Sequence, residues 1–200
     1  AFESAGSRAR QLMMHGNLAF NYILLGLYAR ARVDLEHVKA VQQKMQDRSA
    51  LVYTLDHIAM ASVFLGDTKS AVAAEEEALA LARATGEHRM MGGCEADLGF
   101  ALLEDGQPSA AIPHLRRAVE LAHETLVPEE ATALAWLGAC HLALNDVDAA
   151  LQATSQAVTC LQERGASGDY PPQITWWGRY RALAQAGDQL AGAVEGGVEA

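Results

Sequence analysis

The chain has 200 residues, of which 50% are hydrophobic, and its formal net charge at pH 7 is −10. An acidic chain repels phosphate groups, so this charge argues against nucleic acid as a partner. No run of eighteen apolar residues is present, so no membrane span is expected, and three cysteines at wide spacings favour the reducing cytoplasm over a disulfide framework. Residues 1–8 have neither an initiator Met nor the apolar core of a signal peptide, and we expect them to be the end of a preceding segment.

Four segments of the chain align with one another at offsets of 40, 40 and 39 residues, starting from Leu18, Ile58, Leu98 and Leu137. A small residue follows each of these: Ala19, Ala59, Gly99 and Gly138. Seven residues later comes a residue typical of turns: Gly26, Gly66, Gly106 and Asn145. Two further columns contain alanine almost throughout: Ala31, Ala71, Ala111 and Ala150, then Val38, Ala78, Ala118 and Ala157.

These columns predict pairs of helices. Gly and Asn tolerate the left-handed backbone conformation that ends a helix, and the small residues allow two antiparallel helices to approach closely. The apolar residues between them recur at helical rather than strand spacing. We therefore expect an all-α chain with no strand and with helices at residues 9–25, 29–46, 49–65, 68–84, 89–105, 108–124, 129–144, 147–163 and 173–186.

The arrangement of a small residue, a turn and two alanines resembles the tetratricopeptide repeat, and it covers about 160 of the residues. The resemblance implies a right-handed superhelix, although a period of about 40 residues exceeds the family's usual length of about 34. Stretched repeats of this kind look like those of large bacterial signalling and transcription regulators. The predicted repeats are residues 9–48, 49–88, 89–128 and 129–167, followed by a linker and capping segment at 168–200.

The C-terminal segment has an aromatic cluster that the earlier repeats lack. Trp176, Trp177 and Tyr180 either cap the last core layer or form a binding patch, and we favour the cap. The segment also resembles the closing repeat of bacterial ATPase-linked regulators and adenylate-cyclase fusions. The residues that carry this resemblance are Pro172, Gln173, Trp176, Trp177, Tyr180, Leu183 and Gly187.

An acidic triplet, Glu75 to Glu77, lies in the expected second helix of the second repeat. Glu76 and Glu77 are expected to face water. Glu75 aligns with Leu35 and Leu115, so it is either half buried against a neighbouring helix or rotated outward. We interpret the triplet as part of a helix surface and not as a site.

No motif for catalysis, cofactor or metal is apparent. The seven histidines form no HExxH, and neither a phosphate-binding loop nor a GxSxG elbow occurs. Cys94 and Cys140 lie in apolar surroundings, where thiols are usually inert. We expect no enzyme activity, no catalytic residue, no metal and no cofactor.

The family resemblance implies that first helices line the inner face of the superhelix, where partners bind. The predicted groove is apolar and mildly acidic, and its residues are Phe20, Ile23, Leu24, Tyr53, Asp56, Met60, Phe64, Phe100 and Glu104. The family's Lys- and Arg-based clamp for a C-terminal carboxylate is absent, because residues 49–65 and 129–144 contain neither Lys nor Arg. A protein or peptide with an apolar or amphipathic segment, including a cationic one, fits this groove better.

The sequence thus predicts a module of a larger cytoplasmic regulator that binds a protein or peptide. The alternative is a structural module through which two copies of the chain form a homodimer. A small-ligand sensor is the third and weakest reading, because a fold does not dictate a function.

Overall fold

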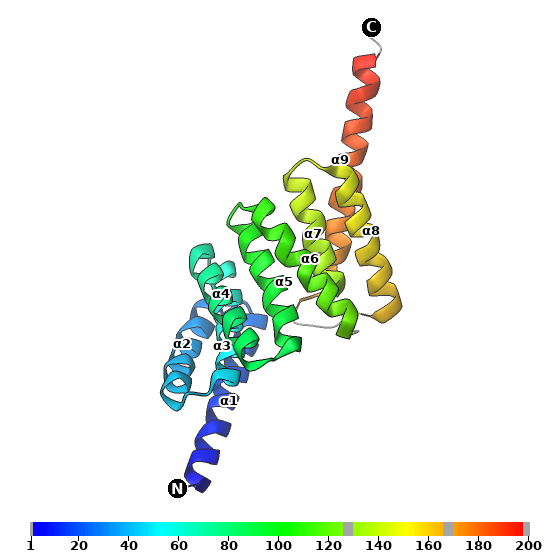
Figure 1. Ribbon diagram of the computed structural model, residues 1–200. Coiled ribbons are helices and arrows are strands. Elements are labelled where there is room, and N and C mark those ends of the chain that lie inside the picture. Colours follow the sequence, from blue (N-terminus) through cyan, green and yellow to red (C-terminus); the bar gives the residue numbers. More distant parts are fainter. Residues whose placement is uncertain (1, 126–129, 166–169, 198–200) are drawn as a thin grey trace. The chain divides into compact units, whose positions relative to one another are not determined.

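The computed structural model of this chain describes residues 2–125, 130–165 and 170–197, and every regular element in these ranges is an α-helix. The helices are α1 (Phe2–Leu24), α2 (Tyr28–Met45), α3 (Arg48–Phe64), α4 (Thr68–Thr85), α5 (His88–Glu104), α6 (Pro108–Thr125), α7 (Glu130–Ala143), α8 (Val147–Arg164) and α9 (Gln173–Gly197). They divide between two compact units, residues 1–105 and 106–200, and within each unit successive helices run antiparallel (Figure 1). None of the described helices has the length and apolar character needed to cross a bilayer.

The helix bounds agree closely with the sequence except at the two ends of the chain. Each helix from α2 to α8 begins and ends within one residue of its predicted bounds. In contrast, α1 starts at Phe2 instead of residue 9, and α9 continues to Gly197 instead of stopping at residue 186. Gly187 follows the predicted end of the last helix, but it lies inside α9, where glycine costs only about 1 kcal/mol relative to alanine. Residues 168 and 169, with which the predicted linker begins, lie outside the described ranges.

The turn column behaves as predicted. The backbone φ angle is positive at all four of its members: Gly26 (75°), Gly66 (77°), Gly106 (75°) and Asn145 (61°). Aspartates add a second signal that the repeat alignment did not single out. The carboxylates of Asp67 and Asp146 accept hydrogen bonds from the backbone N–H groups of Ser70 and Ala149, and each thereby caps the start of a second helix.

The alanine columns form the closest contacts of the fold. Their members are almost completely buried: Ala31, Ala71, Ala111 and Ala150 in the first column, and Val38, Ala78, Ala118 and Ala157 in the second. Because these side chains are short, the paired helices approach closely, and larger residues such as Leu35, Leu55 and Leu115 fill the remaining volume.

In the first unit, α2 packs against α1 and α3, and α4 packs against α3 and α5. The first helices of the repeats also meet one another, because α3 contacts both α1 and α5. The large apolar residue that opens each repeat is buried at Ile58 and Leu98 but 46% exposed at Leu18. Ile58 lies on α3, which packs on the preceding helix α2, whereas no described helix occupies the corresponding place beside α1.

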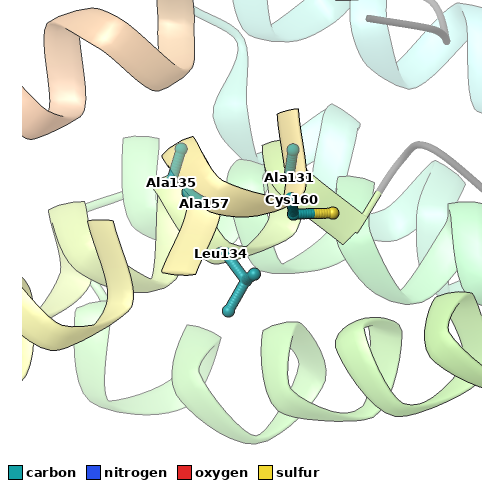
Figure 2. Packing of buried hydrophobic residues seen from close by; sticks show 5 residues of the cluster. All are labelled: Ala131, Leu134, Ala135, Ala157 and Cys160. Atoms are coloured by element: carbon teal, nitrogen blue, oxygen red, sulfur yellow. The ribbon is translucent and has the colours of Figure 1, made fainter. Parts of the chain in front are cut away.

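In the second unit, α7 lies against α6, α8 and α9. Figure 2 shows one core cluster of this unit, in which α7 and α8 contribute the five labelled residues Ala131, Leu134, Ala135, Ala157 and Cys160. Val119 of α6, Leu161 of α8 and Ile174 of α9 pack around this cluster. The C-terminal part of α9 extends beyond α7 and α8 (Figure 1, red).

The aromatic residues of α9 do not cap the core, so the favoured prediction for them is wrong. Trp176, Trp177 and Tyr180 are all about half exposed or more, and the rings of Trp177 and Tyr180 stack on each other with 5.3 Å between ring centroids. Apart from partly buried Ile174, the residues of α9 that face the core are small: Thr175, Gly178 and Ala182. Their spacing of three and four residues places them on one side of the helix, which leaves the aromatic residues on another.

Gly138 allows a close contact between α7 and α8. A Cβ atom at this position would lie 2.5 Å from Cγ2 of Thr154, a fully buried side chain whose hydroxyl donates a hydrogen bond to the carbonyl of Ala150. We therefore expect Gly138→Ala to lower the free energy of unfolding by about 1–3 kcal/mol in urea denaturation. Gly138→Ala combined with Thr154→Ser should recover much of this loss, because serine lacks the clashing methyl group and keeps the hydroxyl.

Gly93 provides the matched control for this prediction. It lies inside α5, and no atom would come within 4 Å of an added Cβ. Gly93→Ala should therefore raise stability by about 0.5–1 kcal/mol, as alanine does in a helix interior. Equal effects of Gly93→Ala and Gly138→Ala would contradict a specific contact at Thr154.

Candidate functional site

Exposed apolar side chains gather on the first helices of the first unit. Of the nine predicted groove residues, Leu24, Tyr53, Phe64 and Glu104 are exposed, and Phe20 and Phe100 are partly buried. Ile23, Asp56 and Met60 are buried, so the prediction that a partner could reach them is wrong. The reason is that α1, α2, α4 and α5 all contact α3 and cover its middle, while Tyr53 and Phe64 lie near its two ends.

Three rings form an aromatic row at one end of this surface. Phe64 at the end of α3 stacks on Tyr28 at the start of α2, with 4.8 Å between ring centroids and 18° between ring planes. Phe100 of α5 lies on the other side of Phe64, with its centroid at 6.5 Å and its plane tilted by 56°. We call Tyr28, Phe64 and Phe100 the aromatic row. Because the three rings come from α2, α3 and α5, which belong to three successive repeats, the row exists only when these repeats are packed together.

A second ring contact joins α1 to α3. The rings of Phe20 and His57 stack with 4.7 Å between centroids. Burial lowers the pKa of His57 to about 4, so its imidazole is neutral at pH 7 and acts here as a packing group. No feature of the sequence had pointed to His57 as a neighbour of Phe20.

Beneath the surface lies a buried acidic cluster that sequence reasoning missed. Asp56 of α3, Glu75 of α4 and Cys94 of α5 each point one potential ligand atom into a space where these atoms lie within 4.8 Å of one another. All three side chains are buried, and neither carboxylate oxygen of Glu75 has a hydrogen-bond partner. Burial raises the pKa of the Glu75 carboxyl well above its usual value, and the negative charges of Asp56 and Asp97 raise it further.

The thiol of Cys94 lies in the same buried, acidic surroundings as Glu75. Burial raises the pKa of Cys94, and the neighbouring carboxylates of Glu75, Asp56 and Asp97 add to the effect. Cys140 in α7 is also a buried free thiol, but burial alone raises its pKa, to about 12. The two cysteines were both expected to be inert core residues, yet only Cys94 lies among acidic groups.

One signal in the sequence could have indicated this cluster. Glu75 aligns with Leu35, Leu115 and Thr154, and all four side chains are fully buried. The other residues of this alignment column are two leucines and a threonine whose hydroxyl is hydrogen-bonded to the backbone. A carboxyl group in such a column is unusual in a core and therefore indicates a special role.

The predicted exposure of Glu76 and Glu77 is confirmed, and Glu77 pairs with Lys39 at 3.5 Å.

The second unit has a shallow hollow between α6, α7 and α8. It is lined by polar side chains that include Glu130, Gln156 and Arg164, with Leu134 and Cys160 beneath them. Arg164 and His123 both contact the Glu130 carboxylate, Arg164 by a direct hydrogen bond and His123 at 3.5 Å. Its one arginine is thus already paired with a carboxylate, so the hollow is a weaker candidate for ligand binding.

The class of fold is established by comparison with known proteins. Residues 97–169 match the family model of the tetratricopeptide repeat. The chain resembles the TPR-like repeats of a Podosopora anserina putative kinesin light chain, with 23% identity, a TM-score of 0.70, and coverage of 90% of this chain and 89% of that one. A search of curated proteins finds no match.

Two further solved structures have the same fold. A Rap protein complexed with Competence and Sporulation Factor matches with a TM-score of 0.76 and 16% identity. The match covers 92% of this chain and 51% of the Rap chain. BtubC from P. vanneervenii matches with a TM-score of 0.70 and 18% identity, covering 92% of this chain and 74% of that one. At these identities the likenesses define the fold, which is that of tetratricopeptide-like helical repeats.

Proposed function

We propose that this chain is a scaffold module of a larger cytoplasmic regulator and that it binds a protein or peptide through the first helices of residues 1–105. The observation that carries the proposal is the aromatic row together with exposed Tyr53 and Leu24. Large apolar side chains that are held rigidly by ring stacking and remain open to solvent are typical of binding surfaces. The resemblance to regulatory arrays of bacterial signalling and transcription proteins supports the regulator context.

The partner is a peptide segment that combines apolar and basic side chains. Its apolar residues would cover Phe64 and Tyr53, and its basic residues would match the negative charge of the chain, which is −10, and of exposed Glu104 on α5. The Rap protein, which has a similar fold, has been solved in complex with Competence and Sporulation Factor, and this supports a binding role for the fold.

A test of this proposal starts from a randomised peptide library displayed against the full chain. We expect selected peptides to combine aromatic or aliphatic residues with Lys or Arg. Their affinity, measured by fluorescence anisotropy, should fall by about tenfold or more for Phe64→Asp, because the short polar side chain of aspartate cannot replace the buried contacts of the ring. Val33→Asp is the matched control, since Val33 is a 67% exposed apolar residue of a second helix.

Two results would contradict the proposal. Selected peptides that bind wild type, Phe64→Asp and Val33→Asp equally would show that the aromatic row is not the binding surface. A dimer in sedimentation velocity that dissociates in Phe64→Asp would instead assign the row to self-association, the alternative function. Circular dichroism of both variants checks that helicity is retained.

A further inference from the structure

Glu75, the central member of the acidic cluster, lacks the hydrogen bonds that buried carboxyl groups normally have. Buried carboxylates in proteins are almost always hydrogen-bonded, paired with a cation or bound to a metal. Glu75 is fully buried, neither of its carboxylate oxygens has a hydrogen-bond partner, and one of them lies within 4.8 Å of ligand atoms of Asp56 and Cys94. Two basic side chains of the first unit form ion pairs with carboxylates other than Glu75: Arg83 pairs with Glu95, and Lys39 pairs with Glu77. The unmet acceptor capacity of Glu75 therefore points to a ligand of positive charge.

We propose that Asp56, Glu75 and Cys94 bind a divalent cation of the zinc type. Three successive helices, α3, α4 and α5, supply one ligand each. A metal at this place would join the second repeat to the third and would satisfy Glu75. The binding site is independent of the proposed function, because the cluster is buried and the aromatic row is on the surface.

The types of ligand select the metal. Mg²⁺ and Ca²⁺ bind oxygen ligands, whereas a thiolate favours softer ions, and zinc accepts a mixture of thiolate and carboxylate. Asp97, one turn after Cys94 on α5, is close enough for its charge to act on Glu75. A water molecule would complete the tetrahedral set as the fourth ligand. Binding requires Cys94 to lose its proton to solvent, so uptake of the metal releases protons.

The spacing of the ligand atoms fits a zinc ion after a small adjustment. Bond lengths of about 2.0–2.3 Å in a tetrahedral site place ligand atoms roughly 3.3–3.8 Å apart. The three atoms of the cluster lie within 4.8 Å of one another, so movements of about 1 Å or less by flexible side chains close the site. The other occupant of such a cluster is a proton, shared among carboxyl groups that cannot all ionise together.

Cobalt provides a spectroscopic probe of the proposed site. The full chain, without a polyhistidine tag and stripped with a chelator, is titrated with Co²⁺. We expect one equivalent to bind with visible absorption of tetrahedral cobalt and a thiolate-to-cobalt charge-transfer band, and Zn²⁺ should displace it. Cys94→Ser should abolish the charge-transfer band, and Glu75→Gln should weaken Co²⁺ binding by about tenfold or more.

Two variants serve as matched controls, and they separate the cluster from other groups. Cys140→Ser removes a buried thiol that lies outside the cluster, and Glu76→Gln neutralises the exposed neighbour of Glu75. Both should bind Co²⁺ as wild type does. A charge-transfer band that survives in Cys94→Ser, or equal weakening by Glu75→Gln and Glu76→Gln, would overturn the proposal.

X-ray absorption of the wild-type protein with one equivalent of Zn²⁺ needs no variant and stays informative if Cys94→Ser fails to fold. We expect one sulfur neighbour and two or more oxygen neighbours around the metal. A coordination shell made only of nitrogen and oxygen atoms would show that the metal binds at histidines instead of at Cys94. If Zn²⁺ does not bind stoichiometrically, the carboxyl groups of the cluster are neutralised by protons and not by a metal. Either result would refute the proposed site.

Discussion

Replacing Trp136 with alanine should lower the free energy of unfolding by about 3–5 kcal/mol. Trp136 is only 4% exposed, and its ring meets that of Tyr170 edge to face, with 4.7 Å between centroids. Truncation leaves a large cavity in the second unit and removes an aromatic pair that contributes about 0.5–1.5 kcal/mol beyond its buried area. Urea denaturation followed by far-ultraviolet circular dichroism measures this loss.

The matched comparison is Trp177→Ala. Trp177 is 60% exposed on α9, so its removal should cost about 1 kcal/mol or less. In an array stabilised by nearest neighbours, Trp136→Ala should reduce hydrogen-exchange protection mainly in α7, α8 and α9, while α2 and α3 stay protected. If Trp177→Ala lowered the free energy of unfolding as much as Trp136→Ala does, Trp177 would have to cap the core after all, although its ring is exposed.

Replacing Glu75 with leucine should raise the stability of the metal-free protein by about 2–4 kcal/mol at pH 8. Leucine already occupies the equivalent fully buried positions Leu35 and Leu115, so a side chain of this size fits at this place in two other second helices. The change removes a buried carboxyl group whose oxygens have no hydrogen-bond partner. Urea denaturation with a chelator present measures the gain, and Glu76→Leu, at an exposed position, should change stability by less than about 0.5 kcal/mol.

The stability gained by Glu75→Leu should increase with pH. The pKa of Glu75 is raised by folding, so the unfolded chain releases this proton at about its usual value of 4.5 while the folded chain still holds it. The contribution of Glu75 to stability is therefore fully present below pH 4.5 and is lost as the pH rises, by about 1.4 kcal/mol per pH unit, until the folded carboxyl ionises. Glu75→Leu should consequently stabilise more at pH 8 than at pH 5.

The same variant connects stability with the proposed metal site. Zn²⁺ should raise the melting temperature of wild type, because a ligand that binds only the folded state stabilises it, and Zn²⁺ should not stabilise Glu75→Leu. A Glu75→Leu protein that is less stable than metal-free wild type at pH 8 would show that the carboxyl group has a stabilising partner in the folded chain.

The candidate surface was predicted only in part. Phe64 and Tyr53 were expected on an exposed face, and they are exposed, because they lie near the ends of α3. Asp56 and Met60 were expected on the same face but are buried by the helices around the middle of α3. Periodicity along one helix identifies which residues share a face, but the number of neighbours that cover this face depends on the packing of other helices.

The sequence by itself determined the repeat, the turns and the bounds of α2 to α8, because these features depend on residues close together in the chain. Gly66 and Asn145 set the left-handed turn, and Ala71 and Ala150 set the close approach that follows. Tertiary structure alone decided which side chains meet across helices. Glu75 lies 19 residues from both Asp56 and Cys94, and only the rotation and packing of α3, α4 and α5 direct all three into one buried space.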